Sequence, residues 1–397
     1  MRGFLAFGGC VDPGCFRHRS ANKSGEIAAD SGMIVTTTGR WPLTAMGGRR
    51  AVGASAIGLL LTVASALAAP AQQQEPTFIS IGGGAVDSAA FRWSSALAQI
   101  LSRPPGLPKC ESGSPCGVPG VIAGAQTYDH PGALLGALTE GRVATGILSA
   151  LEIFQARCDP PKGGQPAPIW ILKALYRQPV RIVAISAKPI RSPKDLAGMT
   201  IALGERGTDS EIVGDALLEA YGPFRRHRPK IVRRAPAQAA AALKDGTVQA
   251  ALFVGHAADA AIGALLASDR FALVPLPESP ERQRLLRALP MFDPDTITAD
   301  TDRSSPETPT LSQRAFWVAG PGLGPGFADK LVSDESDSRN AAHLAELVAP
   351  SVPVAAGDTF GRLPAPPAEG AERYAVTKHH PIDVISCPAR AAAAASR

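Results

Sequence analysis

From Thr77 onward, short apolar runs alternate with longer stretches in which apolar residues recur every three or four positions. Short runs rich in β-branched residues predict buried strands, and the longer recurrence predicts amphipathic helices. Before residue 190 we expect strands at 77–81, 120–125, 143–148, 169–175 and 180–186, with helices at 88–102 and 131–138. Strands interleaved with helices predict mostly parallel sheets covered by helices on both faces.

The alternation starts afresh after residue 190. We expect helices at 192–196, 209–220, 236–243 and 260–266, and strands at 200–203, 231–232, 250–254 and 271–274. Beyond residue 275 it stops: we expect a helix at 280–289, a stretch rich in Asp, Thr and Pro at 293–310, a strand at 314–319 and a helical tail.

Two alternating blocks and a non-alternating remainder indicate an α/β chain with two lobes, in which the last part returns to the first lobe. We expect lobe 1 to consist of residues 77–185 and 277–385, and lobe 2 of residues 186–276. Residues 386–397 are alanine-rich and should form a disordered tail.

Residues 46–71 have the organisation of a secretory signal peptide. Arg49 and Arg50 form its positive start, residues 51–67 are apolar, and the alanines that follow suit cleavage. We therefore expect export to the periplasm, with residues 1–45 either untranslated or disordered. A retained membrane anchor is the alternative interpretation.

This leader also carries most of the net positive charge. The chain has 40 Lys and Arg against 35 Asp and Glu. Residues 1–71 hold seven of the basic and three of the acidic residues, so the rest of the chain has 33 basic and 32 acidic residues. Because basic and acidic residues are nearly equal in number there, we expect no nucleic-acid partner.

Four cysteines lie beyond the leader: Cys110, Cys116, Cys158 and Cys387. An even number in an exported chain favours disulfides, and no Cys-x-x-Cys or His-x-x-x-His spacing supports a metal site. Cys110 and Cys116 flank a short polar turn, so we expect them to pair. The pairing of Cys158 and Cys387 stays open.

The sequence shows no catalytic constellation, because the serine-elbow, HExxH and phosphate-loop motifs are absent. Asp129 and His130 would serve as acid and base if the chain were an enzyme. We expect instead a binding protein with no metal and no cofactor.

The clearest candidate for ligand contact is Gly204-Glu-Arg-Gly-Thr-Asp-Ser-Glu211, between an expected strand and an expected helix. Free N–H groups at the helix start, the hydroxyls of Thr208 and Ser210, and Arg206 would together hold an anion. Asp209 or Ser210 would cap the helix. The alternative is an ordinary capped turn in which Arg206 pairs with a neighbouring carboxylate.

Two other turns are candidates. Gly82, Gly83 and Gly84 follow the first expected strand, and we expect them to leave the backbone exposed to a ligand rather than to pack in the core. A plain flexible turn is the alternative. His256 follows the strand at 250–254, where α/β sheets place ligands, although a solvated loop residue would look the same.

The order of these segments resembles the TAXI solute receptors, the extracytoplasmic binding proteins of tripartite ATP-independent periplasmic (TRAP) transporters. The resemblance spans roughly residues 77–375 and is most specific in 179–262, where SPKDLAG, the glycine–hydroxyl loop and LKDGTVQAALFV keep the family's order. It implies a two-lobed periplasmic binding fold of type II with two hinge strands. It also implies a small anionic or zwitterionic solute that bears a carboxylate, such as an amino acid, and a membrane permease as partner.

Under this resemblance the cleft residues are expected to be Gly83, Gly84, Gln126, Thr127, Tyr128, Thr208 and Ser210, with Arg206 as a charge partner. The chain departs from the family where Tyr128-Asp129-His130 replaces Gly-Gly-Ser and where Asp209 replaces glycine, so the identity of the solute does not carry over. Two other roles stay open: a ligand-sensing module that feeds a signalling partner, and an enzyme on the same fold.

Overall fold

The computed structural model describes residues 75–388 except 109, 112–113, 161–164, 186–189, 223–226, 256–258, 299–306, 325, 350 and 352. The expected signal peptide at 46–71, the segment 1–45 and residues 389–397 of the expected tail lie outside the described residues, and the predictions made for them stay predictions. Among the residues that are described, no helix is both long and apolar enough to cross a bilayer.

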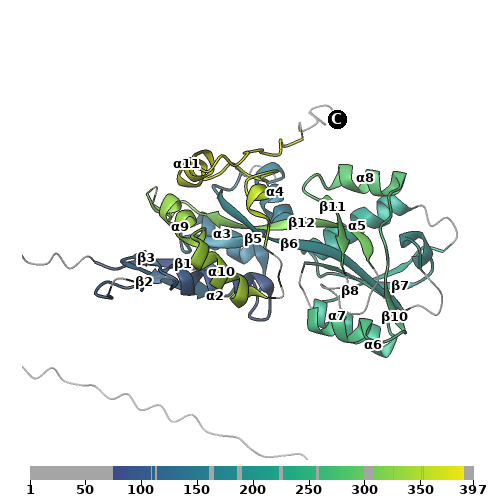
Figure 1. Cartoon of the computed structure of the whole chain (residues 1–397). Coiled ribbons are helices and arrows are strands. Elements are labelled where there is room, and N and C mark those ends of the chain that lie inside the picture. Colours follow the sequence, from purple (N-terminus) through teal and green to yellow (C-terminus); the bar gives the residue numbers. More distant parts are fainter. Residues whose placement is uncertain are drawn as a thin grey trace, which may run out of the picture. The chain divides into compact units, whose positions relative to one another are not determined.

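Lobe 1 is built on a sheet with the strand order β3-β2-β4-β1-β5-β12-β6 (Figure 1). Strands β4, β1 and β5 are parallel, and β12 runs antiparallel between β5 and β6. The strands of this sheet are β1 (Thr77–Gly82), β2 (Ser102–Arg103), β3 (Val118–Pro119), β4 (Val121–Gln126), β5 (Thr145–Ser149), β6 (Trp170–Ile185) and β12 (Thr308–Ala319).

Successive side chains of the central strands point to opposite faces of this sheet, and each face is covered by helices. Trp317 belongs to the same hydrophobic cluster as Trp93 and Leu97 of α2, whereas its neighbour Phe316 belongs to the cluster of Leu134 and Leu151 on the other face. The helices of the lobe are α2 (Ala89–Leu101), α3 (Pro131–Thr139), α4 (Ala150–Cys158), α9 (Phe327–Glu335), α10 (Ser338–Val348) and α11 (Glu369–Thr377), with a 3₁₀ turn at Ala356–Asp358.

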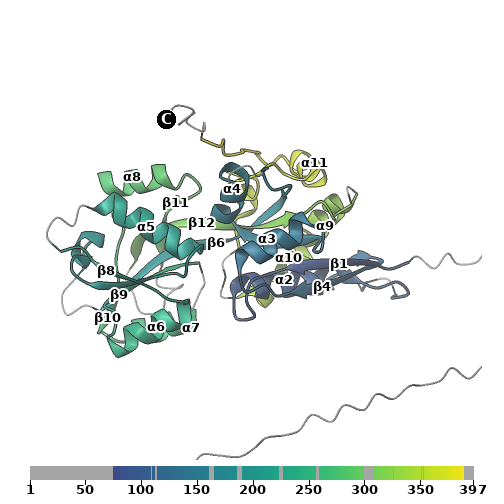
Figure 2. The same cartoon turned by 180° about the vertical axis from the view of Figure 1, so that it is seen from behind.

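Lobe 2 has a sheet with the order β8-β7-β9-β6-β10. Helices α6 and α7 cover one face and α5 and α8 the other (Figure 2). The strands are β7 (Thr200–Leu203), β8 (Lys230–Arg233), β9 (Ala250–Val254) and β10 (Phe271–Leu273), and the helices are α5 (Asp209–Tyr221), α6 (Pro236–Asp245), α7 (Asp259–Leu266) and α8 (Pro280–Ala288), preceded by a 3₁₀ turn at Pro193–Leu196.

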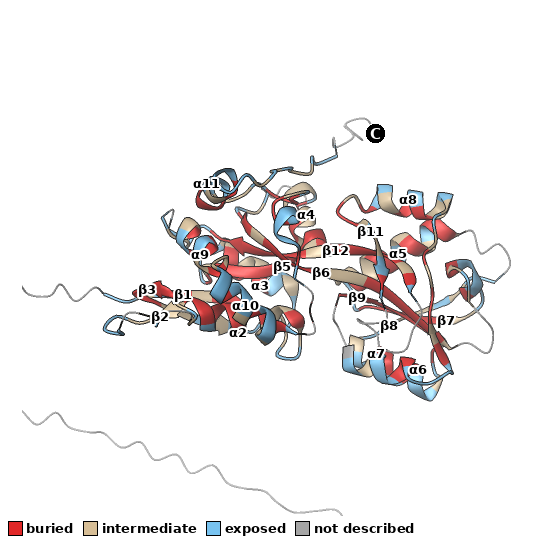
Figure 3. Cartoon of the chain, in the orientation of Figure 1, coloured by how far each residue is buried: buried red, intermediate tan, exposed pale blue. Residues whose placement is uncertain are grey.

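The two lobes repeat one topology. Across each sheet, the parallel strands that come second, first and third along the chain lie side by side. An antiparallel strand follows them, and then a fourth strand. The order is β4-β1-β5-β12-β6 in lobe 1 and β8-β7-β9-β6-β10 in lobe 2. Strands β6 and β12 link the lobes, and their buried residues run through the centre of both (Figure 3). This is the mixed α/β, two-lobed architecture with two hinge strands that the sequence predicts.

Strand β6 corrects one expectation. The sequence predicts two strands, 169–175 and 180–186, because Pro179 removes a backbone donor and marks a break. The structure has one strand, whose first part pairs with β12 and whose residues from Val180 onward pair with β9. Pro179 sits where the strand passes from one sheet to the other, and its carbonyl accepts a 2.9 Å hydrogen bond from the Gly255 N–H.

Helix α4 and strand β11 (Asp293–Ile297) are among the elements that were not anticipated. Helix α4 was missed because only Ala150, Leu151 and Ile153 are buried along it, which gives a weak periodic signal. Strand β11 pairs with the start of β12 although its sequence, Asp-Pro-Asp-Thr-Ile, reads as a loop. Within the range 277–385, which the sequence assigns to lobe 1, helix α8 packs against α5 of lobe 2. The exact division between the lobes therefore stays a prediction.

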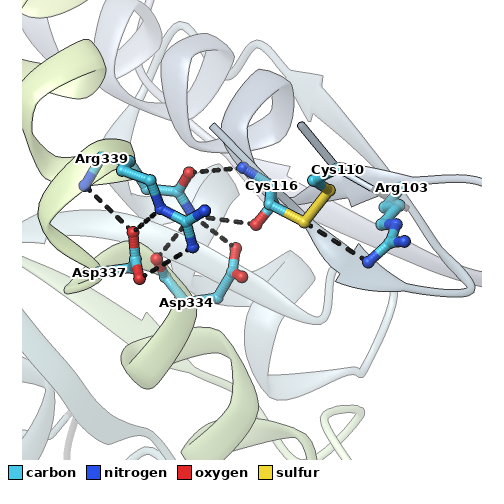
Figure 4. Close-up of polar contacts among 7 residues, drawn as sticks. Arg103, Cys110, Cys116, Asp334, Asp337 and Arg339 are labelled. Atoms are coloured by element: carbon cyan, nitrogen blue, oxygen red, sulfur yellow. Dashed lines mark hydrogen bonds and ion pairs between the residues drawn. A yellow bond between two sulfur atoms is a disulfide. The ribbon is translucent and has the colours of Figure 1, made fainter. Parts of the chain in front are cut away.

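Two disulfides connect the described cysteines. Cys110 pairs with Cys116, and Cys158 at the end of α4 pairs with Cys387 near the C-terminus. The buried side chain of Asn340 anchors the shorter loop: its Oδ1 accepts from the Cys116 N–H at 2.9 Å and its Nδ2 donates to the Cys116 carbonyl at 3.1 Å (Figure 4).

Candidate functional site

A cavity of about 470 Å³ lies between the two lobes, at the ends of the strands that face the junction. Lobe 1 contributes the turns after β1, β4 and β5, and lobe 2 contributes the turns after β7 and β8 and the last residue of β9, Val254. Tyr176, Gln178 and Ala315 of the hinge strands form part of its wall. The carboxyl ends of strands are where open α/β sheets bind ligands, and the volume falls within the range of small-molecule pockets.

Five helix N-termini line this cavity. They belong to α2, α3, α4, α5 and α6, and the lining residues at these termini are Ser88, Pro131, Ser149, Thr208 and Ala235. Side chains cap the first four helices, whereas α6 begins at Ala235 with no side-chain cap. A helix start carries partial positive charge and free N–H groups, so the backbone of the cavity is suited to a carboxylate.

The structure brings five of the eight predicted cleft residues together. Gly83, Gly84 and Tyr128 from lobe 1 and Thr208 and Ser210 from lobe 2 line the cavity.

The other three lie elsewhere. Gln126, Thr127 and Arg206 are exposed and do not line the cavity. Gln126 still touches the site indirectly, because its Oε1 accepts a 3.2 Å hydrogen bond from the Tyr128 hydroxyl. Arg206 makes no ion pair with any described residue, and the choice between an anion-binding turn and an ordinary capped turn stays a prediction.

The glycine turn is tighter than expected. Gly82 and Gly83 are buried, and a Cβ on Gly83 would lie 2.6 Å from the Ser94 Oγ and 2.7 Å from the Phe91 Cα. The prediction that these glycines do not pack in the core is therefore wrong for Gly82 and Gly83. Glycine is needed here because β1 and α2 approach each other too closely for a side chain.

The loop before α5 is capped by a residue other than the two predicted. Thr208 is the N-cap, and its Oγ1 accepts from the Glu211 N–H at 3.4 Å and donates to the Glu205 carbonyl at 2.7 Å. Ser210 is buried, and its Oγ accepts a 3.1 Å hydrogen bond from the Val254 N–H of β9. Both hydroxyls therefore support the fold as well as facing the cavity.

Asp209 has a different partner. Its Oδ2 accepts a 2.6 Å hydrogen bond from Gln313 Nε2 of hinge strand β12. The Oε1 of the same glutamine accepts from the Leu151 N–H at the start of α4, at 2.9 Å. One buried amide thus connects the helix starts of both lobes through the hinge. Gln313 is not among the predicted site residues, and nothing in its neighbourhood distinguishes it from other polar residues of a strand.

Glu152 also lines the cavity and is not among the predicted site residues. It is the third residue of α4, and its Oε2 accepts a 2.8 Å hydrogen bond from the Ser149 N–H while the Ser149 hydroxyl accepts from the Glu152 N–H. Ser149-x-x-Glu152 directly after a buried strand is a capping-box pattern that would have placed this helix start at the cleft.

Burial, followed by the charge of Asp209, raises the pKa of Glu152 to about 8. Burial likewise raises the pKa of Asp209, partly offset by hydrogen bonds from Ser149 and Gln313. Burial, followed by the charge of Glu152, raises the pKa of the Tyr176 hydroxyl. A carboxyl with a pKa near 8 is largely protonated at neutral pH.

Of the two residues named for catalysis, His130 has a structural role. It is the N-cap of α3, and its Nδ1 accepts from the Gly132 N–H at 3.1 Å. Asp129 is exposed and lines the cavity. His256, the third sequence candidate, lies outside the described residues. In the described ranges, no group of three or more His, Cys, Asp or Glu side chains is arranged to hold a metal ion.

The sequence model of the NMT1-like family matches residues 121–375, well over half of the chain. The chain belongs to the NMT1-like family. The match includes the whole of lobe 2, both hinge strands and most of lobe 1. It therefore contains every described cavity residue except those of the turn after β1 and the start of α2.

Solved structures with similar backbones include binding proteins. The periplasmic aliphatic sulphonate binding protein SsuA from Escherichia coli is 15% identical over 77% of this chain and 80% of its own, with a TM-score of 0.39. A TctC solute binding protein from Polaromonas is 12% identical over 70% and 90%, with a TM-score of 0.45. A histidine kinase sensor domain with similarity to periplasmic binding proteins is 12% identical over 70% and 99%, with a TM-score of 0.42.

Proposed function

We propose that this NMT1-like protein is a periplasmic solute receptor that captures a small carboxylate-bearing solute between its lobes and delivers it to a membrane permease of the TRAP type. The observation that carries the proposal is the cavity, whose walls come from both lobes and from both hinge strands. A ligand that contacts both lobes favours the closed arrangement by its difference in affinity for the closed and open states, and a permease can recognise that arrangement.

The size and polarity of the cavity fit an amino acid or a comparable organic acid. The free N–H groups at the uncapped start of α6 offer a place for the solute carboxylate, and Thr208, Ser210 and Tyr128 offer hydroxyls. Micromolar affinity requires about −8 kcal/mol, which a solute of roughly ten heavy atoms supplies at high efficiency. Gln126, Thr127 and Arg206 would then act at the rim.

The test is a thermal-shift screen of residues 72–397 against amino acids and small organic acids, followed by calorimetry and small-angle scattering. We expect at least one compound to bind with a stoichiometry of one, raise the melting temperature and reduce the radius of gyration. Absence of binding and of compaction across the whole panel would remove the receptor assignment. Uptake of the same compound by vesicles that contain the permease, only when the receptor is added, tests delivery.

A further inference from the structure

The charge of the cavity wall is one-sided. Five carboxylates line it, and no Lys, Arg or His occurs among the described lining residues. The acidic residues are Asp87, Asp129, Glu152, Glu205 and Asp209. Three of them are exposed to solvent, whereas Glu152 and Asp209 are only partly accessible.

The two less accessible carboxylates come from opposite lobes. Glu152 lies in the first turn of α4 in lobe 1, and Asp209 is the first residue of α5 in lobe 2. Asp209 Oδ1 is buried and accepts no hydrogen bond among the described residues, although the Ser149 hydroxyl lies close enough to act on the same carboxyl group. An acceptor left in this state on a cavity wall lacks the partner that buried carboxylate oxygens normally have.

The surroundings of the pair do not supply a compensating cation. The groups that face it are the Tyr176 hydroxyl of β6, the Ser149 hydroxyl and the Gln313 amide, all neutral at pH 7. The Arg92 guanidinium of α2 acts on Tyr176, where it lowers the pKa slightly, and is not among the causes acting on Glu152 or Asp209. Without a ligand, a proton on the pair is the available means of neutralising it.

We propose that the solute carries a protonated amine that lies between Glu152 and Asp209 and joins the two lobes. This inference rests on the proposed receptor function and restricts its solute to an amino acid or another amine. The ammonium group donates to the unpartnered Asp209 oxygen and to the Glu152 carboxylate, while the helix starts hold the solute carboxylate. The cation then takes the place of the proton in offsetting the charge of the two carboxylates.

The same geometry links binding to proton release. The ammonium group keeps its three protons, and the proton that Glu152 holds in the free protein passes to solvent when its carboxylate pairs with the cation. A carboxyl with a pKa of about 8 is mostly protonated at pH 7, so we expect release to approach one proton per solute bound. A des-amino solute offers no cation and should release none.

The test compares compounds that differ only in the amine. Each amino acid is titrated calorimetrically beside its des-amino carboxylate, with putrescine added as a diamine probe. We expect the amine to improve affinity by about 10- to 150-fold, the contribution of a hydrogen bond to a charged group. Glu152→Gln and Asp209→Asn should each remove a comparable factor, and Glu219→Gln, an exposed substitution on the same helix as Asp209, should not.

Titration in phosphate and in Tris at pH 7 separates proton release from the heat of binding. Release should be present in the unaltered protein and absent in Glu152→Gln. Equal affinity for the des-amino partners, or unchanged affinity in both Glu152→Gln and Asp209→Asn, would overturn the amine assignment and leave the receptor function intact. If no compound binds or compacts the protein, both proposals fail. If one of the two variants does not fold, the affinity of the other still tests the amine assignment.

Discussion

The side-chain amide of Gln313 donates a 2.6 Å hydrogen bond to the carboxylate of Asp209, joining hinge strand β12 to the first helix residue of lobe 2. The side-chain carbonyl oxygen of Gln313 accepts a hydrogen bond from the Leu151 N–H in lobe 1. Gln313 is almost fully buried, so neither contact can be replaced readily by water. The arrangement ties the starts of α4 and α5, two of the five helix starts that line the cavity, to a single side chain.

Gln313→Met should therefore destabilise the protein by about 1–3 kcal/mol, because the Leu151 N–H and the Asp209 oxygen would both remain buried without this partner. Urea unfolding monitored by circular dichroism measures the change. Gln283→Met is the matched control: Gln283 is exposed and its amide reaches only Glu278, so we expect an effect within about 0.5 kcal/mol. Equal effects of the two substitutions would contradict a structural role for the buried amide.

Thr208→Ala combined with Ser210→Ala should lower both solute affinity and the melting temperature. Loss of the N-cap costs about 0.5–2 kcal/mol, and an unpaired Val254 N–H costs about 1–3 kcal/mol. Differential scanning calorimetry and titration with the solute found in the screen provide the two measurements. Thr208→Ser, which keeps the capping oxygen, should leave the melting temperature close to that of the unaltered protein. A double variant with unaltered stability would show that neither hydroxyl supports the fold.

The two disulfides should contribute unequally to stability. The bond between Cys158 and Cys387 spans 229 residues and that between Cys110 and Cys116 spans six. Constraint of the unfolded chain predicts about 5 kcal/mol for the longer loop and about 2 kcal/mol for the shorter one. Paired Cys→Ser variants, unfolded in urea under oxidising conditions, measure the difference. A larger loss for the short loop would mean that native contacts, such as those of Asn340, dominate over chain entropy.

Stability should also depend on the protonation of Asp334, which lies beside the Asn340 anchor (Figure 4). Burial, followed by the charge of Asp337, raises the pKa of Asp334 to about 7. The folded state then binds more protons than the unfolded state between about pH 4 and pH 7, so its stability falls as the pH rises through this window and is constant above it. Asp334→Asn should flatten that part of the profile.

The measurement is the free energy of unfolding in urea at a series of pH values between 4 and 8. Asp245→Asn serves as the comparison because hydrogen bonds from Thr247 lower the pKa of Asp245 and Asp245 does not act on Asp334, so its removal should alter the profile below pH 4 instead. An Asp334→Asn profile parallel to that of the unaltered protein would exclude the proton linkage.

Much of the fold could be predicted from periodicity because the strands at the sheet centres are wholly buried. Strands β5 and β9 consist entirely of buried residues, and such runs between helical stretches leave little ambiguity. Pro179 and the Asp-Pro start of β11 hide two strand segments from the pattern, because both residue types ordinarily end strands. In β6 the chain context overrides that preference, since β12 and β9 pair with the strand on either side of the proline.

The candidate site could be predicted only in part. Glycines and hydroxyls after strands pointed to the correct turns, since strand ends of parallel sheets gather at one edge. The contacts that connect the lobes could not be found in this way. Gln313 and Asp209 are 104 positions apart, and only the tertiary arrangement brings the amide to the carboxylate.

Strand β6 is a single piece of backbone that closes the sheet of one lobe and completes the sheet of the other. Neither half can consequently be excised and produced as an intact folding unit, since a cut on either side would remove a strand from a hydrophobic core. A shortened gene that encodes only residues 190–276 should yield an insoluble product. Fragments divided within the strand should regain structure only when both are present together.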